Sequence, residues 1–537
     1  MCGILGIFDK KDLDVQKVQE LSKRMRHRGP DEQDFELNES KTGIITHERL
    51  AIIDLQTGKQ PIKGTNNAYV VHNGEIYNHM KLKETELKDY SFSTKCDSEV
   101  IVKLYEKYGT DFCNLLDGVF GFIVMEGDDF MVARDPIGIK PLYYGQDKTG
   151  AYYFSSEMKV IEDQVEKLEA FPPGHFFTKE TGFIKYYQPE WQDHEVCTEE
   201  LDLEKLRDGL IDATKKRLMS DVPVGVLLSG GLDSSLISSI TARLLKEEGK
   251  ELHSFSVGLD ETAPDIIAAR EVADFIGTTH HAIHFSFEEG LSIIDKLIWH
   301  LETYDITSIR ASTPMYIMSK YITDMGIKVV LSGEGSDEIF GGYLYFHNAP
   351  SDEEFQKETI RRVQLLSTAD CLRADKSTMA WALEARVPFL DRNFLDVAMK
   401  IEPSVKRPSR LEGKIEKYIL RKAFDDKETP WLPEHILWRQ KEQFSDGVGY
   451  SWIDDLVDHC AKQISDEEMA QAADLFPVNT PTSKEAMYMR KIFAKHFPSE
   501  SAAKTVKKWI PKWQENEDPS GRASTIHEKT TEAVIEL

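Results

Sequence analysis

A cysteine at the second position is the first residue whose type and place indicate chemistry. Removal of Met1 would make Cys2 the N-terminal residue, with a free α-amino group beside its thiol. An amine with a pKa near ~8 can serve as general base for a thiol with a pKa near ~8.5, so no histidine is needed. A lone cysteine at this place is more typical of a small buried residue on a first strand. Whether Cys2 is a nucleophile therefore depends on the segments that accompany it.

A glycine-rich loop between an apolar run and a helical pattern occurs twice in the chain. Residues 223–236 read PVGVLLSGGLDSSL, and residues 328–343 read KVVLSGEGSDEIFGGY. Backbone N–H groups of such a turn, the start of the next helix and the hydroxyls of Ser229, Ser234 and Ser235 can bind an anion. The first loop has neither the lysine of GxxxxGK[ST] nor a GxGxxG pattern, which disfavours γ-phosphoryl transfer and dinucleotide binding. It predicts an anion-binding site, with a purely structural turn as the alternative.

Each loop also carries an acidic residue, Asp233 in the first and Asp337 in the second. Carboxylates that face a polyphosphate repel it unless a cation lies between them. Because the carboxyl ends of parallel strands meet at one edge of a sheet, these two residues can share a Mg²⁺ ion bound to ATP. We therefore predict that Asp233 and Asp337 form a magnesium site.

Two domains are needed to position these segments. Residues 2–186 are β-rich with a few helices, which predicts an α+β layered domain. Its expected strands lie at 42–46, 68–72, 120–125, 130–133 and 151–155, and its expected helices at 15–26 and 98–108.

The second domain, residues 205–513, follows a polar linker at 187–204. Its expected strands at 222–228, 252–257 and 327–331 alternate with helical patterns, which predicts an α/β domain with a parallel sheet. The part beyond Leu390 is predicted to be mainly helical. The polar tail at 514–537 is predicted to be disordered.

Composition excludes several classes of partner. The chain has 92 acidic and 66 basic residues and a net charge of −26, which disfavours nucleic acid and anionic membrane surfaces. No apolar run approaches the ~18 residues of a membrane span. Six cysteines without regular spacing form neither a disulfide framework nor a zinc site. We therefore expect a protein of the cytoplasm.

Five motifs follow Cys2 in a characteristic order: RHRGPDE (26–32), HERLAIID (47–54), HNGEIYN (72–78), Cys-Asp-Ser (96–98) and ARDPIGIKPLYYG (133–145). Together they resemble the glutaminase domain of class II glutamine amidotransferases, which are N-terminal-nucleophile hydrolases with a layered αββα fold. The resemblance implies that Cys2 is the nucleophile and that Asn73 and Gly74 form the oxyanion hole, for which an amide and a backbone N–H are suited. It places the glutamine-binding residues at Arg49, Leu50, Ala51, Ile52, Ile53, Asn73, Gly74, Glu75 and Asp97.

The segment SGGLDSS resembles the loop of the ATP pyrophosphatases, which cleave ATP between its α- and β-phosphates. That resemblance implies that Glu334 supports an acyl-adenylate step and that Lys441 lies near the phosphates. The implied ATP-binding residues are Leu228, Ser229, Gly230, Gly231, Asp233, Ser234, Ser235, Val257, Ser332, Gly333 and Lys441.

From Cys2 to about Lys512 the chain resembles the glutamine-hydrolysing asparagine synthetases, with further matching stretches at 303–316, 370–391 and 417–424. The resemblance implies glutamine, aspartate and ATP as substrates, a β-aspartyl-AMP intermediate, channelled ammonia and, as a family expectation only, a homodimer. Two alternatives stay open. One is a related enzyme that amidates another carboxylate, and the other is a non-catalytic binding module that keeps the fold.

Overall fold

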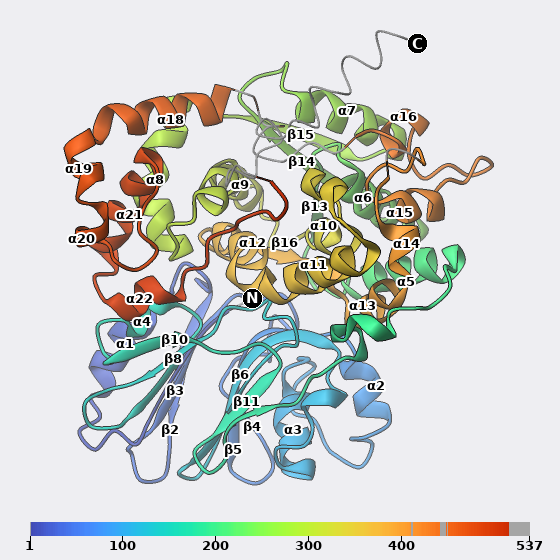
Figure 1. The fold of residues 1–537 in the computed structure, drawn as a ribbon. Helices are drawn as coiled ribbons and strands as arrows, with labels where there is room; N and C mark the ends of the chain where they lie inside the picture. The colour runs from blue at the N-terminus through green and yellow to red at the C-terminus, as the bar shows by residue number, and fades with distance from the viewer. Residues whose placement is uncertain (1, 410–411, 441–446, 448, 450, 515–537) are drawn as a thin grey trace.

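Two antiparallel sheets pack face to face in the N-terminal domain, which forms the lower half of the molecule in Figure 1. The computed structural model describes residues 2–409, 412–440, 447, 449 and 451–514. Across the first sheet the strands are β10 (Lys167–Ala170), β8 (Tyr143–Gln146), β9 (Tyr152–Ser155), β1 (Gly3–Phe8), β3 (Ile44–Arg49) and β2 (Glu32–Leu37). Across the second they are β12 (Gly182–Lys185), β11 (His175–Thr178), β7 (Asp129–Arg134), β6 (Gly118–Glu126), β5 (Ala68–Ile76) and β4 (Ile62–Lys63).

Strand β1 is apolar on both of its faces, so one face packs against the second sheet and the other against a helix. Its side chains alternate between the two faces of the sheet. Ile4 and Phe8 belong to the apolar cluster shared with Val71 and Ile123 of the second sheet. Leu5 and Ile7 instead join the cluster that contains helix α1 (Val15–Lys23). The other helices of this domain are α2 (His79–Glu84), α3 (Glu99–Tyr108) and α4 (Met158–Ile161).

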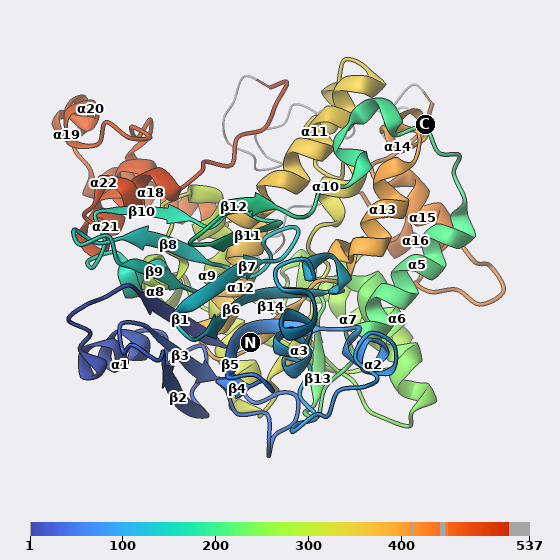
Figure 2. The same cartoon turned by 90° about the horizontal axis from the view of Figure 1, so that it is seen from below.

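A five-stranded parallel sheet forms the centre of the second domain. Its order is β15 (Thr279–His284), β14 (His253–Gly258), β13 (Val224–Leu227), β16 (Val329–Leu331) and β17 (Glu384–Arg386). The helices up to β17 are α5 (Leu203–Lys216), α6 (Leu232–Glu247), α7 (Pro264–Ile276), α8 (Phe287–Leu301), α9 (Ile306–Asp324), α10 (Ser336–Phe340), α11 (Asp352–Leu365) and α12 (Asp370–Met379). Figure 2, seen from below, shows the two sheets of the first domain beneath this part.

The chain after β17 is helical in the part that the structure describes. Its helices are α13 (Arg392–Lys400), α14 (Pro403–Lys406), α15 (Tyr418–Ala423), α16 (Glu434–Leu437), α18 (Ser451–Gln463), α19 (Asp466–Ala470), α20 (Ala472–Leu475), α21 (Lys484–His496) and α22 (Glu500–Thr505). Among all described residues, no helix is both long and apolar enough to cross a membrane. The predicted fold classes of both domains are confirmed, including the helical C-terminal part.

Residues 187–204, expected to be a polar linker, are more ordered than their composition suggests. They contain two one-turn 3-10 helices, Glu190–Gln192 and His194–Val196. Trp191 and Cys197 are fully buried in the cluster that also contains α5 and α13. Two apolar side chains are enough to hold this segment on the second domain. The predicted disordered tail lies outside the described residues apart from Gln514.

Candidate active sites

Cys2 lies where the first sheet meets the second. It precedes β1, and because Gly3 pairs with Glu48 of β3, the cysteine lies beside the segment that begins at Arg49. Its backbone N–H donates to Oδ1 of Asn73 over 2.9 Å, and its Sγ lies 3.9 Å from the carbonyl oxygen of Leu50. The side chain is 7% exposed, and burial raises the pKa of the thiol. The structure thus brings the predicted nucleophile against one of the two predicted oxyanion-hole residues.

Asn73 and Gly74 lie at the end of β5. Because Oδ1 of Asn73 accepts from Cys2, its Nδ2 points elsewhere, and this buried atom has no acceptor among the described residues. Gly74 has φ +150°, and a Cβ there would come within 1.9 Å of the carbonyl oxygen of Val119. Only glycine fits this position. An unused amide donor beside a thiol is the arrangement that an oxyanion requires.

The predicted glutamine-binding segment 49–53 lies next to Asp97. Asp54, which directly follows the segment, accepts from the backbone N–H of Lys95 over 2.8 Å. Arg49 pairs with Glu32 over 2.7 Å and donates to the carbonyl oxygen of Asp54 over 2.6 Å. Asp97 is buried and accepts from the backbone N–H of Ile76. A guanidinium and a carboxylate near Cys2 are suited to the carboxylate and ammonium groups of a free amino acid.

Other members of the predicted glutamine set face the second domain. Leu50 and Ile52 pack with Val329 and Met379, whereas Ile53 is only partly buried at that cluster. The backbone N–H of Ala51 donates to Asp31 over 2.8 Å. The side chains of Leu50 and Ile52 therefore help to hold the two domains together.

Glu75 makes an ion pair across the domain boundary. Its Oε1 lies 3.2 Å from Nη2 of Arg386 on β17, and Arg386 also binds Glu384 over 2.5 Å. All three side chains are almost completely buried. Burial and the neighbouring Glu384 raise the pKa of the Glu75 carboxyl. No motif indicated that Glu75 would have a partner in the other domain.

The second predicted site is a cavity at the carboxyl edge of the parallel sheet. Strands β13 and β16 pair in register and end together, which places their two loops side by side. A Cβ on Gly333 would come within 2.8 Å of both Asp233 and Ser234, so the close approach of the loops requires glycine. The predicted residues that line this cavity are Leu228, Ser229, Gly231, Asp233, Ser234, Val257, Ser332, Gly333, Glu334 and Asp337.

Three predicted nucleotide-binding residues do not line the cavity or are not described. The structure places Gly230 against Ala268, behind the loop. Ser235 is fully buried, one turn into α6. Lys441 lies outside the described residues.

Lys417 is a cation of this cavity that sequence reasoning missed. Its Nζ lies 2.5 Å from Asp233 and 2.7 Å from Asp337, and its side chain is 1% exposed. Asp233 also accepts from the hydroxyl of Ser336 over 2.7 Å. A single lysine before a short helix has no neighbouring motif that predicts a phosphate-binding role. The sequence indicated only that Lys417 belongs to the matching stretch 417–424. The two acids that we predicted as metal ligands are thus held near each other by an ammonium group.

The residues present fit a bound Mg²⁺ ion. Both Asp233 and Asp337 line the same cavity and offer carboxylate oxygens. The described residues contain no cluster of three or more His, Cys, Asp or Glu side chains that would hold a metal alone. Mg²⁺ is typically bound by one or two carboxylates together with substrate phosphates and water. Two carboxylates beside a phosphate-binding loop match that preference.

Glu334 is held by an arginine from helix α12. Nη2 of Arg373 lies 2.7 Å from Oε2 of Glu334 and 3.5 Å from Asp370. Burial raises the pKa of the Glu334 carboxyl, and Arg373 acts in the opposite direction. All three side chains line the cavity. Arg373 was another residue that sequence reasoning missed, because it is 39 positions away from Glu334.

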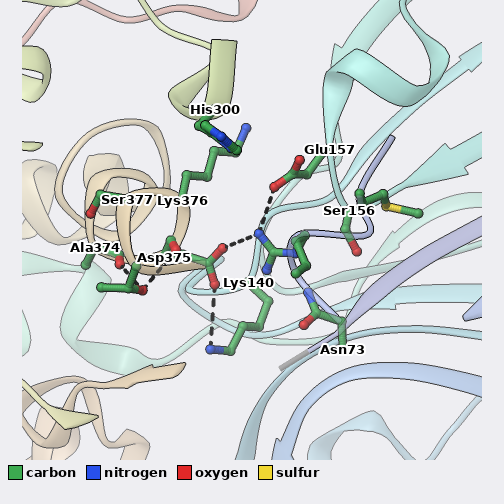
Figure 3. Close-up of polar contacts among 12 residues, drawn as sticks. Asn73, Lys140, Ser156, Glu157, His300, Ala374, Asp375, Lys376 and Ser377 are labelled. Atoms are coloured by element: carbon green, nitrogen blue, oxygen red, sulfur yellow. Dashed lines mark hydrogen bonds and ion pairs between the residues drawn. The ribbon is translucent and has the colours of Figure 1, made fainter. Parts of the chain in front are cut away.

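A buried group of charges joins the two sites (Figure 3). Arg28 donates from Nε to the carbonyl oxygen of Cys2 over 3.0 Å. Its Nη1 lies 3.0 Å from Glu157 and 2.8 Å from Asp375 of α12. In Figure 3, Asp375 points from α12 toward Lys140 of the first domain, at 3.8 Å. Since α12 also carries Arg373, one helix contacts the surroundings of both Cys2 and Glu334.

Comparison with known proteins agrees with this two-domain arrangement. A family model described as glutamine amidotransferase domain matches residues 1–187, and one described as asparagine synthase matches residues 205–353 and 349–517. The chain is thus a protein of the class in which a glutamine amidotransferase domain is followed by an asparagine synthase domain.

Among curated proteins, asparagine synthetase (glutamine-hydrolysing) 1 of Arabidopsis thaliana is 50% identical, with 98% of this chain and 94% of the relative covered. The probable asparagine synthetase (glutamine-hydrolysing) of Dictyostelium discoideum is also 50% identical, with 99% of this chain and 100% of the relative covered. The chain belongs to the family of glutamine-hydrolysing asparagine synthetases. Among solved structures, an allosteric regulatory enzyme of purine biosynthesis is 18% identical, with a TM-score of 0.32 and 52% of this chain and 80% of that chain covered.

Proposed function

We propose that this chain synthesises L-asparagine from L-aspartate, with L-glutamine as nitrogen donor and ATP as the activating substrate. The observation that supports it most is the joining of two sites in one chain, one around Cys2 and Asn73 and the other around the phosphate-binding loop and Glu334. Its products are L-glutamate, AMP and pyrophosphate. The six cysteines are all free, which supports a reducing compartment such as the cytoplasm.

The first half of the proposed reaction releases ammonia from glutamine. The thiolate of Cys2 attacks the side-chain amide, and the negative charge develops on the amide oxygen. Nδ2 of Asn73 and the backbone at Gly74 stabilise that charge. Arg49 binds the α-carboxylate of glutamine, and Asp97 binds the α-ammonium group together with Glu75. The C–N bond of the intermediate then breaks, the α-ammonium group of Cys2 returns its proton to the nitrogen, and ammonia leaves behind a thioester on Cys2. Water hydrolyses this thioester and frees glutamate.

The second half activates aspartate. A carboxylate does not react with ammonia because oxide is a poor leaving group, whereas an acyl-adenylate releases AMP. The loop 229–235 binds the pyrophosphate part of ATP, and Lys417 supplies positive charge beside it. Glu334 takes a proton from the attacking ammonia, and Arg373 orients its carboxylate. Mg²⁺ held by Asp233 and Asp337 neutralises phosphate charge when bound.

Ammonia must pass from one site to the other. At neutral pH free ammonia in water is mostly ammonium, which is not nucleophilic, so an internal route protects it. The interface near Arg28, Lys140 and Asp375 lies between the two sites and is buried. We propose that ammonia crosses the domain boundary in this region.

A substrate screen tests the proposal. The full chain is given ATP, Mg²⁺ and glutamine with aspartate or with another carboxylate, and AMP, pyrophosphate, glutamate and carboxamide are measured together. Equal formation of AMP and asparagine with aspartate is expected. Product with another carboxylate but not with aspartate would favour the related amidating enzyme. Absence of AMP with every carboxylate would favour the binding module.

A further inference from the structure

A second cavity lies in the C-terminal part of the chain, between the start of α9 and helices α18 and α21, which Figure 1 shows at one side of the second domain. Its volume is about 400 Å³. Of the described residues, only Thr307 lines both this cavity and the nucleotide cavity. The proposed reaction does not use it, although its wall includes residues 304–307 and Arg310 of the matching stretch 303–316.

The acidic side chains of this cavity already have partners. Both oxygens of Glu485 bind Arg310, over 2.9 Å and 2.6 Å. Asp305 caps α9 by accepting from Ser308, and its other oxygen accepts from the backbone N–H of Trp509. Glu485 is therefore neutralised by Arg310, and both oxygens of Asp305 are occupied by neutral donors.

Arg490 of α21 is the cation of this cavity with buried, unused donors. It is 6% exposed, and its buried Nε and Nη1 have no hydrogen-bond partner among the described residues. Its guanidinium lies over the rings of Tyr304, Phe476 and Phe493, at 4.7, 4.5 and 5.5 Å from the ring centres. Burial lowers its pKa. Rings stabilise a cation but do not accept its five N–H groups in the plane.

Other stacked arginines of this chain do have acceptors. Arg362 lies over Trp509 at 3.7 Å, and it donates to Glu358 and to the carbonyl oxygen of Ile510. Arg243 lies over Trp431 at 3.6 Å, and it donates to two carbonyl oxygens. Stacking alone is therefore not how this protein satisfies an arginine. Among the described residues, Nε and Nη1 of Arg490 have no carboxylate or carbonyl acceptor of the kind that Arg362 and Arg243 have.

Further features give the same cavity positive potential. Nζ of Lys508 donates to the carbonyl oxygen of Thr480 over 3.2 Å and has no carboxylate partner among the described residues. The first residues of α9 and of α21 lie in the wall, so the positive ends of both helices face the cavity. This cationic site lies in a chain whose net charge is −26.

We propose that this cavity binds a small organic anion, whose carboxylate or phosphoryl group is held by the guanidinium of Arg490 and the ammonium of Lys508. An arginine fork binds such planar or tetrahedral anions through paired hydrogen bonds, and a lysine adds a point charge. Thr307 separates the anion from the nucleotide cavity. The site is independent of the proposed reaction, because binding requires no turnover.

Calorimetric titration of the full chain at constant ionic strength tests the site, with inorganic phosphate and succinate as probes. Arg490→Lys keeps a cation over the rings but removes the fork, and Lys508→Met removes the second charge. Arg243→Lys is the matched control for a stacked arginine elsewhere. Ser229→Ala controls for anion binding in the nucleotide loop.

We expect one probe to bind the wild type at millimolar concentration or below, and each of the two cavity variants to weaken it by about tenfold or more. Binding should be unchanged in Arg243→Lys, and any component of binding that is lost in Ser229→Ala belongs to the nucleotide loop and not to this cavity. Tighter binding of phosphate would identify a phosphoryl ligand, and tighter binding of succinate a carboxylate ligand. If Arg490→Lys does not fold, the partly exposed Lys508 decides the test. Absence of binding by both probes, or binding that Lys508→Met leaves unchanged, would overturn the proposal.

Discussion

Arg373 donates from Nη2 to Oε2 of Glu334 over 2.7 Å, and this pair joins α12 to the loop that follows β16. Glu334 is in a site that raises its pKa, and the guanidinium limits that rise. A carboxylate with a raised pKa is a better proton acceptor than an ordinary glutamate, which suits a group that must take a proton.

Replacing Arg373 should move the pH dependence of synthesis. A base works only when deprotonated, so activity falls as pH falls through the pKa of Glu334. Arg373→Met removes the cation that lowers this pKa, and the acidic limb should therefore shift to higher pH. Ammonium-driven asparagine formation is measured across pH at a matched concentration of free ammonia. Arg373→Lys should shift less because it keeps the charge, and an unmoved limb in Arg373→Met would contradict the base role of Glu334.

Cys2→Ala should separate the two half-reactions. Glutamine-dependent synthesis should be lost, whereas synthesis from ammonium should persist, because Glu334 and the phosphate-binding loop are in another domain. Asparagine is measured with each nitrogen source. Cys113→Ala is the control, since Cys113 is another buried cysteine of the same domain. Full glutamine-dependent activity in Cys2→Ala would exclude this residue as nucleophile.

Asp337→Asn should impair adenylation with both nitrogen sources. One anionic ligand of the proposed magnesium site is lost, while hydrolysis of glutamine in the absence of ATP should continue. The measurement is AMP formation against Mg²⁺ concentration, where the variant should need more metal. Glu338→Gln is a neighbouring control, because Glu338 accepts from Tyr343 and does not line the cavity. A normal magnesium dependence in Asp337→Asn would rule out the shared site.

Lys417→Met should weaken adenylation for a different reason. Without the ammonium group, Asp233 and Asp337 repel each other and the polyphosphate across the same cavity. We expect exchange between pyrophosphate and ATP to fall by about tenfold or more, since a charged hydrogen bond contributes about 1.5–3 kcal/mol. Lys422→Met, an exposed lysine on α15, should leave exchange unchanged. Equal exchange in the two variants would show that Lys417 has only a structural role.

Asp375→Asn should destabilise the chain and uncouple its two sites. Arg28 would keep Glu157 but lose its partner on α12, and a buried charge deprived of a partner costs about 3 kcal/mol. A lower Tm is expected, with glutamine-dependent synthesis reduced more than ammonium-dependent synthesis, because Arg28 also holds the carbonyl of Cys2. Asp324→Asn, at an exposed pair on α9, is the control for Tm. Equal losses with both nitrogen sources would argue against a link through Arg28.

Local pattern was sufficient for the motifs and for part of the elements, whereas strands such as β2, β12, β15 and β17 were not predicted. Apolar runs that end in Gly, Ser and Asp turns predicted β13, β16 and their loops, because a strand, a turn and a helix start depend on neighbouring residues. The same holds for Cys2 and for the segments around Arg49, Asn73 and Asp97, which are short and contiguous. The order of the linker 187–204 was also not predicted, because the burial of Trp191 depends on its packing with residues of α5 and α13.

Only the tertiary structure decided which charges meet. Lys417 lies between Asp233 and Asp337, although it is 184 positions from the first. Glu75 pairs with Arg386 of the other domain, and Nε and Nη1 of Arg490 have no acceptor among the described residues. A side chain's charge is visible in the sequence, but its partner depends on how helices and strands pack, because the Coulomb energy depends on distance in space. The chain's residues thus determined which two chemistries are present, and the packing determined how their sites are connected and where a further anion can bind.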